Sequence, residues 1–212
     1  MTKTNVRIRF AKTGRASFLG HLELMDAMRR AARRADLPLR YTEGFHPRPV
    51  LNLGRALSVG IESECEFMDV GLSEAMDLQE VCTRLNAVVP HGVQVHEAHL
   101  ITEVTPPLDG GIVATRFEVN LVDAEAYRAK LAAYATAVAW PVTMTRRDKV
   151  AQIDLKTALT ELAMIDSSVL GTTLSHAGPS MGIFDMLKAL FDLTDAEARA
   201  LYVRKVAVEF KS

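Results

Sequence analysis

The feature that most constrains this chain is the alternation of two apolar periods along it. In some segments apolar residues occupy every second position, as in a half-buried strand, and in others every third or fourth, as in an amphipathic helix. In the first half they predict the order strand, helix, strand, strand, helix, strand. The segments are 6–10, 20–37, the apolar runs 50–53 and 56–61, then 67–72, 77–89 and 94–101.

A mid-chain stretch rich in Pro and Gly, TPPLDGG at 105–111, predicts a domain boundary. A second round of elements follows it. These are a strand at 116–122, a helix from its cap Asp123 to about 138, strands within 140–146 and 151–166, a helix at 181–193 capped by Ser180, a capping box of Thr194 and Glu197, and a strand at 203–210. The stretch 153–164 also fits a helix.

The repeated order is that of the split βαβ unit, an antiparallel sheet with helices on one face. We therefore expect an α+β protein made of two ferredoxin-like halves. The first half is residues 1–103, the linker is 104–111, and the second half is residues 112–212.

The composition is that of a globular protein, with 49% apolar and 24% charged residues. No apolar run approaches the roughly 20 residues of a membrane helix. The first ten residues, MTKTNVRIRF, alternate apolar and polar side chains instead of forming a secretory signal. We therefore expect a cytoplasmic protein without a membrane segment.

Side chains that bind metals are poorly placed for such a role. Cys65 and Cys82 lie in different elements and have no metal-ligand spacing, so we expect buried thiols. His96 and His99 fall on one predicted strand, where a separation of three places them on opposite faces. Together with His91 and Glu97 they therefore predict no metal site, and we expect no cofactor.

Charge is distributed unevenly along the chain. Residues 1–60 contain 12 Lys or Arg and 4 Asp or Glu, a balance of +8, although the whole chain carries −1. Such an asymmetry favours an anionic partner for the basic part, with nucleic acid ahead of a membrane.

The helix predicted at 20–37 concentrates this charge on one side. Its apolar residues share an arc of about 120°, and its four arginines share an opposite arc of about 140°. The adjoining loops add further cations, so we expect a surface that contacts nucleic-acid phosphates whatever the base sequence. Its candidate residues are Lys12, Arg15, His21, Arg29, Arg30, Arg33, Arg34, Arg40, His46 and Arg48. Reversing the charge of Arg33 and Arg34 is expected to leave the fold intact.

The sequence also resembles a known family. The segments that carry the resemblance are Gly20-His21-Leu22, RRAARRADLPLRYTEGFHPRP at 29–49, and the runs 60–64 and 66–70. They are similar to those of the radical SAM-linked protein family, a domain of unknown function fused to radical SAM proteins or encoded beside them. Where members commonly have Asn and His after the Gly-Phe pair, this chain has His46 and Arg48, which leaves the loop cationic.

The resemblance implies two partners. One is a radical SAM protein, and the other is RNA, because genes of the family often lie near those of an RNA-processing nuclease and of ribosomal proteins. A radical SAM enzyme anchors its cluster with three closely spaced cysteines, which Cys65 and Cys82 cannot supply. We therefore expect a non-catalytic accessory protein that binds RNA or presents it as a substrate.

Two alternatives stay open. The Met-rich helix at 181–193 has a wide apolar side, which suits an adaptor that docks a radical SAM protein. His21 and His46 near arginines suit the acid and base of a metal-independent endoribonuclease. A His that starts a helix is more often a capping or packing residue, so the sequence favours a protein that is not an enzyme.

Overall fold

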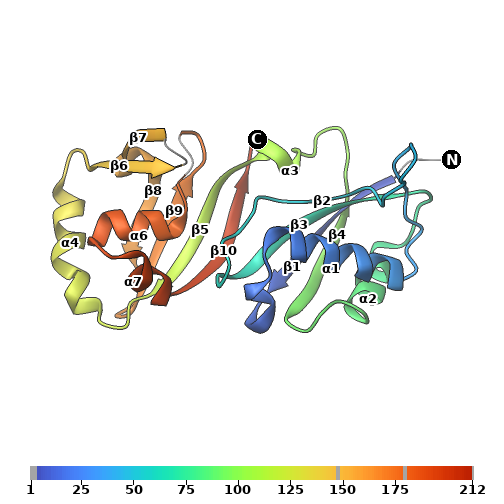
Figure 1. Ribbon diagram of the computed structural model, residues 1–212, viewed down its shortest axis with the longest axis horizontal. Helices are drawn as coiled ribbons and strands as arrows, with labels where there is room; N and C mark the ends of the chain where they lie inside the picture. Colours follow the sequence, from blue (N-terminus) through green and yellow to red (C-terminus); the bar gives the residue numbers. More distant parts are fainter. Residues whose placement is uncertain (1–3, 147–148, 179–180, 212) are drawn as a thin grey trace. The chain divides into compact units, whose positions relative to one another are not determined.

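The computed structural model describes residues 4–146, 149–178 and 181–211 (Figure 1). The chain divides into two compact units, residues 1–112 with 211–212, and residues 113–210. Each unit contains helices and antiparallel strands, so the expected α+β class is confirmed. The ferredoxin-like description of each half is finer than this class and stays a prediction.

The first unit follows the element order that its apolar periods predict. Its elements are β1 (Thr4–Lys12), the 3-10 helix η1 (Gly14–Phe18), α1 (His21–Arg34), β2 (Leu51–Leu53), β3 (Glu62–Leu72), α2 (Leu78–Asn86), β4 (Val93–Leu100) and the short turn α3 (Leu108–Gly111). The strands lie in the order β4-β1-β3-β2, and each neighbouring pair is antiparallel.

The two faces of this sheet have different characters. Val6, Ile8 and Phe10 of β1 lie in a core shared with α1 and α2. On the other face, Arg7 pairs with Asp69 of the adjacent strand, with Nε 2.8 Å from Oδ1 and Nη2 2.9 Å from Oδ2. Because two parallel hydrogen bonds satisfy both charges, this ion pair can be largely buried.

The two cysteines of this unit belong to its interior. Cys65 on β3 and Cys82 on α2 are free thiols, and both are buried, as the sequence predicts. Burial raises the pKa of the Cys82 thiol above its ordinary value. Both side chains therefore act as small apolar residues of the core.

The second unit contains more strands than the sequence predicts. Its elements are β5 (Ile112–Asn120), α4 (Ala124–Thr136), β6 (Pro141–Arg146), β7 (Lys149–Asp154), α5 (Leu155–Ala158), β8 (Leu159–Met164), β9 (Val169–Ser175), α6 (Ile183–Phe191), α7 (Asp195–Ala200) and β10 (Tyr202–Phe210). Four strands lie in the order β10-β5-β9-β8, and β6 pairs with β7 in a separate hairpin.

Strand β9 has no counterpart in the sequence prediction. Its five central residues, 170–174, are all buried, so the strand has no alternation of apolar and polar positions to mark it. The ambiguous stretch 153–164 divides into the end of β7, the single turn α5, and β8. Asp154 begins that turn because its carboxylate accepts from the Lys156 N–H, 2.9 Å away.

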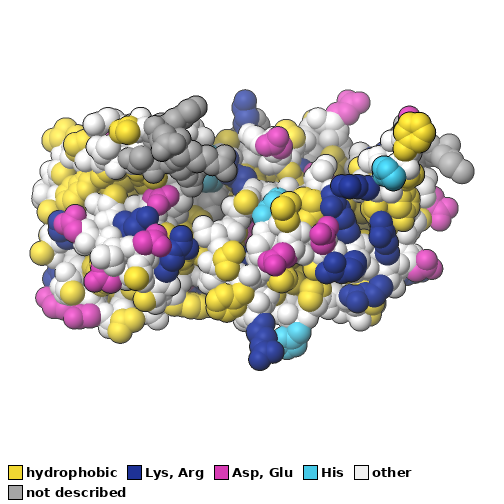
Figure 2. All heavy atoms as spheres, viewed as in Figure 1, with side chains coloured by type: hydrophobic (Ala, Val, Ile, Leu, Met, Phe, Trp, Pro, Cys, Tyr) yellow, Lys and Arg dark blue, Asp and Glu magenta, His cyan; other side chains and the backbone are white. Residues whose placement is uncertain are grey.

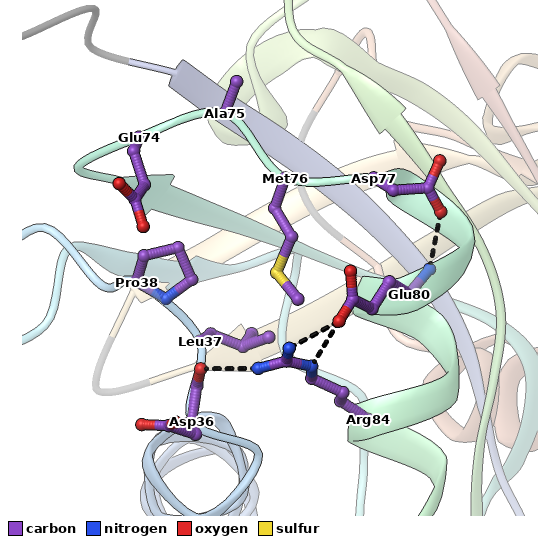
Figure 3. A pocket seen from close by; sticks show the side chains of 9 residues that line it. All are labelled: Asp36, Leu37, Pro38, Glu74, Ala75, Met76, Asp77, Glu80 and Arg84. Carbon is purple, nitrogen blue, oxygen red and sulfur yellow. Dashed lines mark hydrogen bonds and ion pairs between the residues drawn. The ribbon is translucent and has the colours of Figure 1, made fainter.

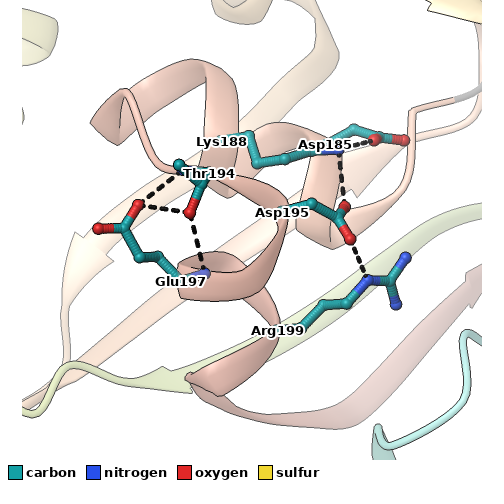
Figure 4. Close-up of polar contacts among 6 residues, drawn as sticks. All are labelled: Asp185, Lys188, Thr194, Asp195, Glu197 and Arg199. Carbon is teal, nitrogen blue, oxygen red and sulfur yellow. Dashed lines mark hydrogen bonds and ion pairs between the residues drawn. The ribbon is translucent and has the colours of Figure 1, made fainter.

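The caps predicted at two helices of this unit are confirmed. Asp123 accepts from the Ala126 N–H at the start of α4, and Thr194 and Glu197 form the capping box of α7 (Figure 4). Gly182 is the N-cap of α6, and the predicted cap Ser180 lies outside the described residues.

Helices α6 and α7 are joined by a charged cluster. Lys188 Nζ lies 3.1 Å from both Asp185 Oδ1 and Asp195 Oδ1, and Arg199 Nε lies 2.7 Å from Asp195 Oδ2 (Figure 4). The hydrogen bonds to Asp185 and Asp195 raise the pKa of Lys188 above its ordinary value.

In the described part of the chain, no helix is long and apolar enough to cross a membrane.

Candidate nucleic-acid interface

Helix α1 owes its position to one apolar side. Leu24, Met28, Ala31 and Ala32 are buried against the sheet, as the helical wheel predicts. The helix begins after Gly20, whose N–H donates to Oε2 of Glu23 in the first turn at 2.8 Å. With this side fixed in the core, the arginines of the opposite arc face outward.

A hollow of about 390 Å³ lies beside the exposed side of α1. Its lining residues are Asp26, Arg29, Arg30, Arg33, Arg48 and Pro49. Lys and Arg side chains gather over α1 on the face seen in Figure 2. We call this site the arginine hollow; it brings together four of the ten candidate residues, including Arg48 from a separate loop.

The loop that supplies Arg48 is held closed at its base. Tyr41 and Pro49 form an isolated antiparallel bridge, and Thr42 N–H donates to the Arg48 carbonyl at 2.8 Å. In return, Arg48 N–H donates to Thr42 Oγ1 at 3.1 Å. These bonds fix the backbone of Arg48 and leave its guanidinium available beside α1.

The arginine hollow carries a net positive charge. Asp26 is its one acid among the described lining residues, and it pairs only loosely with Arg29, at 3.3 Å. The guanidiniums of Arg30, Arg33 and Arg48 form no hydrogen bond or ion pair with any other described residue. Since like charges close together repel, this cluster favours an anion among them.

One donor in the hollow is also unsatisfied. Arg29 Nε is buried from solvent and has no hydrogen-bond partner among the described residues, although its side chain as a whole is 25% exposed. A buried donor without a partner costs free energy until an acceptor reaches it. A phosphate oxygen that entered the hollow could supply that acceptor.

Two other candidate arginines do not line the hollow; they form hydrogen bonds within the protein. Arg34 Nη2 donates to the Val88 carbonyl at 2.5 Å. Arg40 Nη2 donates to Asn5 Oδ1 at 2.7 Å. Both guanidiniums therefore join segments that lie far apart along the chain.

Lys12 is also occupied within the protein. It is 1% exposed, and its ammonium donates to the carbonyls of Ser17 and Leu19. A side chain enclosed in this way does not present its charge to a ligand at the surface.

The last three candidates are dispersed. Arg15 and His46 are exposed and do not line the hollow. His21 lines a different depression of about 540 Å³, with Arg55 and Asp69 among its neighbours, and His46 is not part of that lining. The two histidines therefore do not share either of these cavities, as an acid–base pair would require.

A third depression, of about 470 Å³, has the opposite charge (Figure 3). Four carboxylates line it, from Asp36, Glu74, Asp77 and Glu80, but two of them already have protein partners. Asp77 caps α2 by accepting from the Glu80 N–H at 2.9 Å, and Glu80 pairs with Arg84. Among the described residues, no group of three His, Cys, Asp or Glu is arranged to hold a metal ion.

Sequence reasoning alone overlooks the aromatic residues of the loop at 41–49. Phe45 is 102% exposed and Tyr41 is 45% exposed. A signal for them exists, because an aromatic residue between Gly and Pro in a loop lies at the surface.

Comparisons with known proteins give a family match without a described activity. Residues 5–183 match a family described as an uncharacterized protein conserved in bacteria, DUF2344. No curated protein matches the chain. Among solved structures, the crystal structure of an unknown protein from Galdieria sulphuraria covers the whole of both chains, at 13% identity and a TM-score of 0.30.

Proposed function

Because the chain belongs to DUF2344, a bacterial family of uncharacterized proteins, we propose a function from its own geometry: it binds RNA through phosphates in the arginine hollow. The observation that carries this proposal is the excess of guanidiniums there. Four arginines accompany one carboxylate, and three of the guanidiniums have no partner among the described residues.

An arginine side chain binds a phosphate group in a more defined geometry than a simple point charge does. Its planar fork donates two parallel hydrogen bonds to adjacent phosphate oxygens, and it stays charged at any physiological pH. Contacts of this kind are insensitive to base sequence, so the hollow would position an RNA backbone without selecting its sequence. The role proposed is accessory, not catalytic.

The partner and location that the sequence resemblance implies belong to the same proposal. The motifs at 20–22, 29–49 and 60–70 support an association with a radical SAM enzyme in the cytoplasm, to which this protein would present RNA. The alternative adaptor role is less favoured, because Phe184, Leu187 and Phe191 on the apolar side of α6 are buried within the protein.

The test compares charge reversals inside and outside the hollow. The binding of a fluorescein-labelled RNA to the full chain is measured by anisotropy over a series of KCl concentrations. Arg30→Glu, Arg33→Glu and Arg48→Glu should each weaken binding and lower the salt slope by about 0.7 for each phosphate that is no longer bound.

The matched control is Arg128→Glu, which makes the same charge change on α4 of the second unit. It should bind RNA as the wild type does. If all four variants bind with the affinity and salt slope of the wild type, the arginines are only a solvated surface and the proposal is wrong.

A further inference from the structure

We propose that the RNA bound at the arginine hollow is single-stranded, and that an unpaired base stacks on Phe45 in the loop that supplies Arg48. This inference rests on the proposed function and adds the class of RNA. Its starting point is the complete exposure of Phe45, 102%, in the same loop that supplies Arg48.

The loop holds Phe45 out as a platform. Two hydrogen bonds between Thr42 and Arg48 close its base, while every residue from 41 to 48 is exposed. Gly44 turns the chain at the tip with φ of 118°, a backbone conformation that L side chains rarely adopt. An aromatic ring mounted on a closed loop loses less freedom on binding than one on an open chain.

The surroundings of Phe45 favour a role in binding a ligand over a role in stabilising the fold. The whole ring faces solvent, so it adds nothing to the core of the first unit. A solitary exposed apolar residue is ordinary by itself. This one is three residues from Arg48 and next to His46, a second ring that is also exposed. Exposed rings and guanidiniums on one surface are the combination that single-strand binding uses, with cations on the backbone and rings on the bases.

A duplex cannot use this arrangement fully. Its bases are already stacked and paired, and the narrow major groove of A-form RNA keeps side chains from the base faces. A single strand offers a free base face at each nucleotide, and stacking is tolerant of sequence. The phosphates in the arginine hollow and the base on Phe45 would then come from one short stretch of RNA.

The experiment uses the full chain and three labelled probes of about 12 nucleotides, within the size range of single-strand sites. They are a single strand without self-complementarity, the duplex of that strand, and a strand of the same length with abasic positions. Wild type should prefer the first, and Phe45→Ala should weaken only that interaction, by about 10-fold.

Further variants separate stacking from apolar contact. Phe45→Leu keeps an apolar side chain and should weaken binding as much as Phe45→Ala does, whereas Phe45→Trp should preserve it. Relative to the wild type, whose one indole is that of Trp140, the fluorescence added by Phe45→Trp should be quenched by the base-bearing strand and not by the abasic strand. Phe18→Ala is the matched control, because Phe18 is 68% exposed in the same unit and does not line the hollow.

The outcomes distinguish this inference from the proposed function. Equal binding of base-bearing and abasic strands, unchanged by Phe45→Ala but weakened by Arg33→Glu, would overturn base stacking and leave phosphate binding standing. RNA binding that none of Arg30→Glu, Arg33→Glu and Arg48→Glu changes would overturn both. If Phe45→Ala weakened single-strand and duplex binding equally, the single-strand assignment would be wrong.

Discussion

Arg34 Nη2 lies 2.5 Å from the carbonyl oxygen of Val88 and joins the end of α1 to the residue just beyond the C-cap of α2. Its neighbour Arg33 is also exposed, and its guanidinium has no hydrogen bond or ion pair with another described residue. Two adjacent arginines that the helical wheel treats alike therefore have different roles, one within the fold and one toward a ligand.

The first prediction follows from this difference. Arg34→Ala should lower the free energy of unfolding by about 0.5–1.5 kcal/mol, the usual contribution of one hydrogen bond. Arg33→Ala should leave stability unchanged and weaken RNA binding more than Arg34→Ala does. Urea denaturation and RNA anisotropy on both variants give the comparison. An equal decrease of stability in the two variants would contradict the structural role of Arg34 and restore the sequence expectation that both are surface residues.

The second prediction concerns the close approach of Arg40 to Gly71. A methyl group on Gly71 would lie 2.8 Å from Arg40 Nη2 and 3.0 Å from Val50 Cβ. Gly71→Ala should therefore destabilise the first unit by about 1–3 kcal/mol, as overpacking does. The control is Gly54→Ala, where the nearest atom would be 3.6 Å away, an ordinary contact. Similar denaturation midpoints for the two variants would show that Arg40 moves aside without cost.

The third prediction concerns the pH dependence of the second unit. Asp154 Oδ1 accepts from the Trp140 N–H at 2.8 Å and the Lys156 N–H at 2.9 Å, and these bonds lower the pKa of Asp154. Because the pKa is lower in the folded state, the stabilisation is present above the ordinary aspartate pKa and is lost as pH falls toward the lowered one.

Asp154→Asn removes the charge and with it this dependence. The variant should be less stable than the wild type at neutral pH, and the gap should narrow as the pH falls below the ordinary aspartate pKa. Thermal midpoints of both proteins measured from neutral to acid pH provide the check. Two curves that stay parallel over the whole range would show that the carboxylate charge adds nothing.

The fourth prediction is a gain of affinity. Asp26→Asn removes the one acid among the described residues of the arginine hollow and releases Arg29 from its ion pair. RNA affinity should rise by about 2- to 5-fold at low salt, and the gain should shrink as salt is added. Glu125→Gln breaks an ion pair of the same i,i+3 spacing on α4 and should leave RNA affinity unchanged. A fall in affinity for Asp26→Asn would mean that Asp26 orients Arg29 for binding.

The sequence predicts those features that depend on one element alone. The buried and exposed sides of α1 and the caps at Asp123 and Thr194 follow from residues a few positions apart. The burial of Lys12 is not predictable from such a pattern, because the pairing of β1 with β3 shifts register between Phe10 and Lys12 and Ala11 is buried as well.

Features that depend on contacts between residues far apart in the sequence are not predictable in this way. Arg48 reaches the arginine hollow because a bridge between Tyr41 and Pro49 closes its loop, and no local pattern marks that bridge. The same holds for Arg40 and Arg34, whose partners lie far along the chain. A count of arginines on a helical wheel or in a loop cannot separate these two from the arginines that line the hollow.

The buried cysteines make opening of the first unit measurable. Because the thiols of Cys65 and Cys82 are enclosed, neither reacts readily while that unit is closed. Residues 113–210 contain no cysteine at all. The rate at which a thiol reagent labels the intact protein under native conditions therefore reports transient opening of the first unit. Opening of the second unit contributes nothing to the measured labelling.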